Sequence, residues 1–269
     1  MTRLQPWFAV LLAAAVLGFP LWLVVATAGK SQSEALTPDL SPPSDWRLVE
    51  NLGQVWTQGR VPAAFLGSLL IVVPTVLVAL VVGSMAAWIL ARRSSLLIAG
   101  CYAFAISGIV LPPAVVTVVL LLRHLGLAGT AVGMIGVYLG IYLSTVIFFV
   151  TGFVRTVPTS IEEAALIDGA GPMLVFRRVV LPMLRPVLAT VTVLVCLYVW
   201  NDVFYAFFVV GGRMDTLPLN LFEVASAGLY LNNWHLIFAY VILMSLPPLA
   251  VLAVAQRQLI SGITSGAVK

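Results

Sequence analysis

The chain has 269 residues, of which 61% are hydrophobic and only 9% are charged, and its mean hydropathy is +1.10. Soluble domains carry about 25% charged residues, so this composition excludes an ordinary soluble protein and indicates an integral membrane protein. The net charge of +4 comes with no basic cluster larger than two adjacent arginines, so it does not indicate a nucleic-acid partner. Because the apolar runs are long rather than alternating over ten residues, we predict an all-α membrane protein.

About six apolar runs are long enough to cross a bilayer, which takes about 20 residues of helix. The predicted spans cover residues 7–28, 64–90, 96–122, 130–153, 184–210 and 236–255. The first run ends on Ala26-Thr27-Ala28, which resembles a signal-peptide cleavage site. That run is longer than the apolar core of a signal peptide, so we expect a retained span. We therefore expect a single transmembrane domain over residues 1–269.

Prolines and polar residues mark the breaks between and within these spans. The third run contains Pro112-Pro113, and a proline pair kinks or unwinds a helix. This bend is either a packing feature or part of a solute pathway, and the sequence leaves both open. Residues 29–62 and 211–234 are polar, so both are predicted to be loops.

Basic residues predict which loops face the cytoplasm, because positive charge accumulates there. With the loop at residues 158–182 placed inside, nine of the 14 basic residues are cytoplasmic and five are external. The inner set is Arg3, Arg92, Arg93, Arg155, Arg177, Arg178, Arg185, Arg257 and Lys269, and the outer set is Lys30, Arg47, Arg60, Arg123 and Arg213. Both termini are then expected on the cytoplasmic side.

The segment at residues 158–182 is the one long stretch of the second half that is charged and amphipathic. Acidic residues such as Glu162 and Glu163 lie at its front and Arg177 and Arg178 near its back, an arrangement that suits the helix dipole. Glycine accepts a left-handed turn and proline favours the first helical position. Gly169 to Pro172 is therefore predicted to end one short helix and start another.

The same segment resembles the EAA loop in the membrane subunits of binding-protein-dependent ABC importers. That motif is E-A-A, three residues, G, nine residues, and I-x-L-P, and valine replaces isoleucine here. In that family the loop is a coupling helix that lies in a groove of the cytoplasmic ATPase. The alternative is an ordinary cytoplasmic loop helix. The resemblance assigns ATPase coupling to Glu163, Ala164, Ala165, Gly169, Val179, Leu181 and Pro182.

The last 14 residues resemble the ending Q-R-x-x-x-x-G-(L/I)-T-x-G-A-V-K of carbohydrate-type permeases, the group that includes the second permease of the maltose transporter. This resemblance implies that the tail contacts the ATPase subunits. The residues concerned are Gln256, Arg257, Gly262, Thr264 and Gly266. One departure from the group is Trp88, which stands where tyrosine is usual before the arginine that ends the second span.

Trp200-Asn201-Asp202 lies near the middle of the fifth predicted span. A carboxylate at membrane depth is costly unless it is paired or hydrated, so such residues face the bundle interior or a water-filled cavity. Asp202 therefore either lines a pathway for a polar solute, with Trp200 and Tyr205 as stacking faces, or makes a structural contact with another helix or a partner. Both interpretations remain open.

A second candidate for the pathway is the outer loop that contains Thr216, Pro218 and Asn220. It resembles a T-L-P stretch of sugar-type permeases, in a loop that reaches toward the pathway. The alternative is a solvent-exposed connector.

Together these resemblances imply a type I ABC importer permease (MetI-like) fold in the bacterial plasma membrane, importing a sugar or sugar derivative. The implied partners are a second homologous permease in a heterodimer, two ATPase subunits, an extracytoplasmic binding protein and the lipid bilayer. The chain has no phosphate-binding loop, so we expect no enzymatic activity in it, and ATP and Mg to be bound by the ATPase subunits. Cys101 and Cys196 lie in apolar runs and predict no metal site. An ion-gradient-driven secondary transporter is the alternative, but it requires several ionisable residues within the spans, and Asp202 is the one clear acid there.

Overall fold

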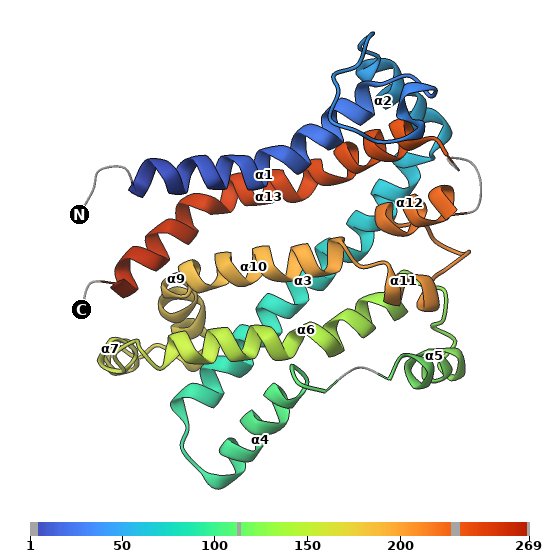
Figure 1. Cartoon of the computed structure of the whole chain (residues 1–269). Coiled ribbons are helices and arrows are strands. Elements are labelled where there is room, and N and C mark those ends of the chain that lie inside the picture. Colours follow the sequence, from blue (N-terminus) through green and yellow to red (C-terminus); the bar gives the residue numbers. More distant parts are fainter. Residues whose placement is uncertain (1–4, 112–113, 227–231, 268–269) are drawn as a thin grey trace. The chain divides into compact units, whose positions relative to one another are not determined.

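The computed structural model describes residues 5–111, 114–226 and 232–267, and helices account for its regular secondary structure in these ranges (Figure 1). The chain divides into two compact units, Met1–Leu66 with Asp215–Pro247 and Gly67–Met214 with Pro248–Lys269. The helices α3 (Val61–Arg92) and α13 (Trp234–Ala267) each contribute to both units.

The first unit contains α1 (Gln5–Gly29), the short 3-10 turn Glu34–Leu36, α2 (Leu48–Gln58) and α12 (Leu217–Ser226). Polar side chains order the connection between α1 and α2. The ammonium of Lys30, which is 2% exposed, contacts the Asp39 carboxylate and donates to Ser41 Oγ at 3.1 Å. The side-chain amide of Asn51 donates to the carbonyls of Ala28 and Lys30 at 2.8 and 3.0 Å, which attaches α2 to the end of α1.

The second unit is built around α6 (Ala131–Val154), which packs against α4 (Leu96–Ser107) and runs beside α10 (Arg185–Trp200) in Figure 1. A short helix, α5 (Val115–His124), precedes α6. Between α6 and α10 lie α7 (Ser160–Ile167), α8 (Pro172–Val175), a π-helical turn at Phe176–Val180, and α9 (Leu181–Met183). Helix α11 (Phe204–Val209) follows α10.

Four helices in the described residues are long and apolar enough to cross a membrane. They are Val10–Gly29, Val61–Arg92, Ala131–Val154 and Trp234–Gln256, which match four of the predicted spans. A bent pair, Pro172–Met183 and Arg185–Trp200, makes a fifth span if it is counted as one, with an angle of 76° between its parts. The predicted all-α membrane architecture is therefore confirmed.

Two predicted spans are not continuous helices. The helix expected over residues 96–122 is divided into α4 and α5, and the first of these ends at Ser107. Pro112 and Pro113 lie in this interval but outside the described residues. The helix expected over residues 184–210 ends at Trp200 and resumes only at Phe204. The first break falls where the proline pair predicted a kinked or unwound helix, whereas the second was not predicted, because residues 203–210 are as apolar as those before them.

The segment predicted as a polar loop at residues 211–234 contains the helix α12. Its first turn is buried, with Leu217 at 1% and Leu219 at 0% exposure. The hydroxyl of Tyr240 donates to Asn220 Oδ1 at 2.7 Å. Therefore, the prediction of a solvent-exposed connector is wrong for this part of the loop.

Candidate functional site

The loop between α6 and α10 has the predicted helix-turn-helix form. Helix α7 ends at Ile167, and Gly169 adopts a φ of +84°, a left-handed conformation that residues with a side chain rarely adopt. The N–H of Ala170 donates to the carbonyl of Ala165 at 3.0 Å, which closes the turn. Pro172 then occupies the start of α8, as its fixed φ favours. Thr159 precedes α7 but its side chain makes no capping hydrogen bond.

A clamp of three side chains holds α7 against the end of α3. Arg92 donates from Nε and Nη2 to Glu162 Oε1, at 2.9 and 2.7 Å, and the Trp88 indole donates to Oε2 at 2.8 Å. Arg92 Nη2 also donates to the carbonyl of Val157 at 2.9 Å. Glu162 is 8% exposed, and charge-assisted hydrogen bonds of this kind are the strong ones. We call Trp88, Arg92 and Glu162 the α3–α7 clamp.

The sequence did not indicate this clamp. From the sequence, Arg92 contributed only to the predicted orientation of the chain. Trp88 was noted only as a difference from the related permeases. The sequence assigned coupling to Glu163 and gave Glu162 no role of its own, whereas the structure shows that Glu162 is buried in the clamp and Glu163 is exposed.

The opposite face of the loop is apolar and exposed. Five large hydrophobic side chains of α7 and α8 are 41–86% exposed: Ile161, Leu166, Ile167, Met173 and Leu174. The predicted coupling residues Glu163, Ala164 and Gly169 are also exposed. Exposed apolar patches of this kind mark interaction sites. We call these five side chains the loop patch.

Of the other predicted coupling residues, Ala165 lies in α7 and is half-buried, and the remaining three lie further back in the loop. Val179, Leu181 and Pro182 are half-buried. Leu181 and Pro182 line a pocket that is also lined by α10 and α13. The structure thus exposes most of the first part of the motif, at α7 and Gly169, and half-buries its last part, at Val179, Leu181 and Pro182.

Asp202 lies at the break between α10 and α11 rather than inside a helix. Its Oδ2 accepts a hydrogen bond from the Tyr138 hydroxyl at 2.8 Å and from the N–H of Ala206 at 3.1 Å, and its Oδ1 accepts from the N–H of Tyr205 at 3.4 Å. The carboxylate therefore joins α6 to the first turn of α11. This geometry supplies the structural contact that was one of the two sequence interpretations.

Aromatic rings continue from this contact along α6 and α10. Tyr138 stacks on Tyr142 with centroids 6.0 Å apart, and Tyr142 stacks on Tyr198 at 5.6 Å. Tyr198 is 49% exposed, whereas Trp200 is only 3% exposed. In this conformation the ring of Tyr198 is therefore accessible, whereas that of Trp200 is not.

The remaining predicted pathway residues are placed separately. Asn201 is exposed and donates to the carbonyl of Leu197 at 2.8 Å. Tyr205 lines a cavity of about 370 Å³ with apolar residues of α5 and α6. Thr216, Pro218 and Asn220 are buried in the first unit.

Most of the C-terminal residues predicted to contact the ATPase have side chains that the structure does not describe. The backbone of α13 is helical to Ala267, and the Gln256 side chain is exposed. The side chains of Arg257, Thr264 and the other residues from 257 onward are not among those described.

The apolar helices, joined by the loop between α6 and α10, define a multi-pass membrane protein. The sequence profile of the family described as "Binding-protein-dependent transport system inner membrane component" matches residues 79–265. The chain belongs to this family, as the sequence motifs predicted.

Relatives and a solved structure agree with this assignment. The chain is 30% identical over 257 residues to the melibiose/raffinose/stachyose import permease protein MelC of Bacillus subtilis, a match that covers 93% of this chain and 91% of the relative. It is 31% identical over 255 residues to the diacetylchitobiose uptake system permease protein NgcG of Streptomyces coelicolor, covering 92% and 82%. A bacterial ABC transporter involved in import of the acidic polysaccharide alginate includes a chain with the same fold, with a TM-score of 0.79, 19% identity, and coverage of 96% of this chain and 98% of that one.

Proposed function

We propose that the chain is one permease subunit of an ATP-driven importer for a sugar or sugar derivative. The relatives described above are named for the uptake of saccharides, which supports this class of cargo. We propose a second, related permease as its partner in a heterodimer, with an extracytoplasmic binding protein delivering the cargo. The bilayer segments of both permeases would enclose the pathway.

The main support for a role in coupling to the ATPase is the exposed loop patch beside the α3–α7 clamp. An exposed apolar surface needs a partner, and we propose that this partner is a groove in one of two cytoplasmic ATPase subunits. Those subunits bind ATP and Mg. Because Glu162 fastens α7 to Arg92 and Trp88, a movement of the groove would be transmitted to α3 rather than absorbed by a loose loop.

This role places the loop and both chain termini in the cytoplasm. It also implies that the permease has two conformations. The ATPase and the binding protein can shift the equilibrium between these conformations only if each binds the two with different affinity. Glu163, exposed beside the patch, and the tail from Gln256 onward are proposed as further contacts with the ATPase.

We propose the ring of Tyr198 as an accessible stacking face for the cargo, with Asn201 as a neighbouring polar group. Both are exposed near the end of α10. The carboxylate of Asp202 would hold this region in place through Tyr138.

The coupling role is tested by co-purification of the ATPase with the tagged full chain. Ile167, which is 86% exposed, should contribute about 1.5–3 kcal/mol if it is buried on docking. Ile167→Asp is therefore expected to reduce ATPase recovery at least tenfold. Val49→Asp is the matched control, because Val49 is 84% exposed but lies on α2. Equal recovery with both variants would contradict the proposal.

The energy source is tested by uptake into vesicles that contain the assembled importer. Uptake should continue after ion gradients are collapsed and stop when ATP is removed. Uptake that follows the ion gradient instead would favour a secondary transporter.

A further inference from the structure

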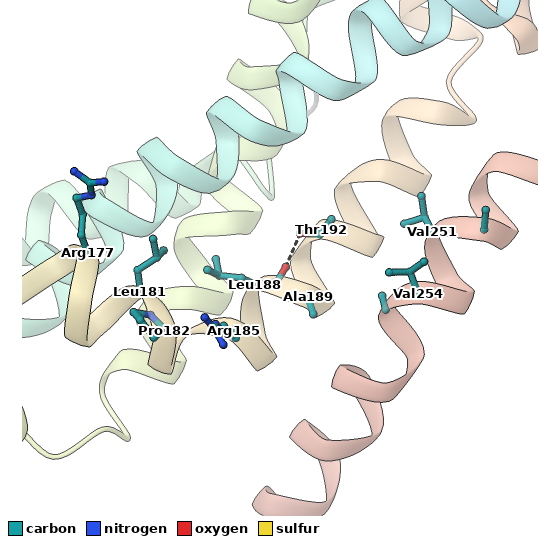
Figure 2. Close-up of a pocket in the computed structure, with 11 residues that line it drawn as sticks. Arg177, Leu181, Pro182, Arg185, Leu188, Ala189, Thr192, Val251 and Val254 are labelled. Atoms are coloured by element: carbon teal, nitrogen blue, oxygen red, sulfur yellow. Dashed lines mark hydrogen bonds between the residues drawn. The ribbon is translucent and has the colours of Figure 1, made fainter.

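A pocket of about 790 Å³ lies between the α9–α10 segment and the second half of α13, within the second unit. Figure 2 shows Leu188 and Ala189 of α10 on one side and Val251 and Val254 of α13 on the other. The one hydroxyl in the lining, that of Thr192, already donates to the carbonyl of Leu188 at 2.7 Å. The walls therefore suit an apolar chain rather than a sugar.

The charged residues of the lining are both arginines, Arg177 and Arg185. Both are exposed, and neither guanidinium forms an ion pair with a carboxylate in the part of the chain that the structure describes. Arg185 is the first residue of α10, at the 76° bend between the two parts of the broken candidate span. The pocket thus combines apolar walls, formed by α10 and α13, with two exposed cationic groups.

We propose that this pocket binds an anionic phospholipid. The headgroup phosphate would be held by Arg177 and Arg185, and an acyl chain would lie along the apolar walls between α10 and α13. Basic pockets between membrane helices on the cytoplasmic side bind anionic headgroups in this way. Arginine suits this role because its planar group can donate two parallel hydrogen bonds to one phosphate.

The charge of the two arginines and the apolar walls together favour an anionic phospholipid as the occupant. A free phosphate would leave the apolar walls unused, and a neutral lipid would leave both arginines without an anion. The assignment to the cytoplasmic leaflet rests on the orientation proposed above, whereas the binding itself does not depend on it. Because Leu181 and Pro182 of the coupling loop also line the pocket, a bound lipid would connect the base of that loop to α13.

Lipid retention by the purified full chain tests the proposal. The chain is solubilised, incubated with equal amounts of phosphatidylglycerol and phosphatidylcholine of matched acyl chains, and examined by native mass spectrometry. We expect preferential retention of phosphatidylglycerol. Arg177→Gln and Arg185→Gln should each reduce this preference about fivefold, whereas Arg178→Gln should not, since Arg178 is equally exposed but does not line the pocket.

A second pair of variants tests the apolar part. Ala250→Trp fills the pocket and should reduce retention of both lipids, whereas Leu249→Trp, at an exposed neighbouring residue outside the lining, should not. An unchanged phosphatidylglycerol preference in the Arg177/Arg185 double variant would overturn the proposal. So would full displacement of phosphatidylglycerol by inorganic phosphate. Loss of the second permease from the complex with Ala250→Trp, without a change in lipid retention, would identify the pocket as a protein interface instead.

Discussion

Arg92 at the end of α3 directs two N–H donors onto one carboxylate oxygen of Glu162 in α7, at 2.9 and 2.7 Å. The two residues are 70 positions apart in the sequence, and the Glu162 side chain is only 10% exposed. This ion pair thus attaches α7 to α3, a helix long and apolar enough to cross a membrane.

Glu162→Ala is expected to destabilise the chain, because it leaves the donors of Arg92 and Trp88 without their acceptor. Removing one partner of a buried ion pair costs about 3–5 kcal/mol. The melting temperature of the solubilised chain should fall, and ATP-driven uptake should fall with it. Thermal unfolding monitored by tryptophan fluorescence would measure the first effect.

Glu163→Ala is the matched control at the adjacent position. Glu163 is exposed, so its loss should leave the melting temperature unchanged while reducing recovery of the ATPase. Identical melting of the Glu162→Ala variant and the wild type would show that the clamp does not hold α7.

Gly169→Val should leave the protein in the membrane yet abolish ATP-driven uptake. Gly169 has a φ of +84°, and a Cβ there would meet no atom within 4 Å. The cost is therefore backbone strain, about 1–3 kcal/mol for a residue with a side chain in this region, increased by the β-branch. The strain would reorient the turn that joins α7 to α8.

Gly171→Val separates this strain from the effect of added bulk. Gly171 also has free space around it, but its φ of −68° is compatible with any residue. Uptake should persist in this variant. If both variants transport normally, the left-handed turn is not part of the coupling mechanism.

Several features could be predicted from the sequence because they depend on local patterns. The length of the apolar runs predicted α1, α3, α6 and α13, and the glycine and proline residues from Gly169 to Pro172 predicted the turn between α7 and α8. The α3–α7 clamp could not be predicted in this way. Its members are brought together only by the packing of α7 on α3, and Arg92 also satisfies the charge rule that set the orientation.

The helix break near Asp202 was missed for a different reason. Residues 203–210 are as apolar as those before them, so hydropathy continues where the helix stops. The Asp202 carboxylate accepts hydrogen bonds from backbone N–H groups of α11. Such a side chain competes with the backbone hydrogen bonds of a continuous helix, and a hydropathy average does not detect this. Helix α12 was missed for the opposite reason, since residues 211–216 before it are mostly polar or glycine, whereas Leu217 and Leu219 are buried.

Cysteine labelling tests the orientation. In a Cys101→Ser background, which removes the exposed native cysteine, Val49→Cys should react with an impermeant thiol reagent from outside intact cells. Ser160→Cys should react only after the cells are opened. Both positions are exposed in the structure, so accessibility does not limit the reaction. The reverse pattern would invert the proposed topology.

The loop between α1 and α2 should keep its order down to acidic pH. Hydrogen bonds from Ser44 and from the N–H of Ser31 lower the pKa of Glu34 to about 2, and contact with Lys30 and then Ser41 lowers the pKa of Asp39 to about 2. A lowered folded-state pKa stabilises the fold above the unfolded-state value, about 4, and this contribution is lost as the pH falls toward 2.

Hydrogen exchange of residues 31–44, corrected for intrinsic rates, would measure this order. The amides of Ser31, Ser41 and Ser44 donate to these carboxylates, so their protection should decline only below about pH 4. In the Glu34→Gln variant, which cannot ionise at position 34, the pH dependence at Ser31 and Ser44 should disappear. Loss of protection already near neutral pH would contradict the assignment.

Asp202 and Tyr138 should behave as a coupled pair. Asp202→Ala removes the acceptor for the Tyr138 hydroxyl at 2.8 Å and for the N–H of Ala206, whereas Tyr138→Phe removes only the hydroxyl. Because a hydrogen bond to a charged group contributes about 1.5–3 kcal/mol, the double variant should be less destabilised than the sum of the single variants by that amount. Thermal unfolding of the wild type, the two single variants and the double variant would measure this interaction.

Asp202→Asn keeps an acceptor and should retain most of the stability and assembly with the second permease. If Asp202→Asn instead reduces uptake while assembly and stability stay intact, the charge itself acts on the cargo. Strict additivity of the two single variants would show that the contact between α6 and the α10–α11 break does not stabilise the protein.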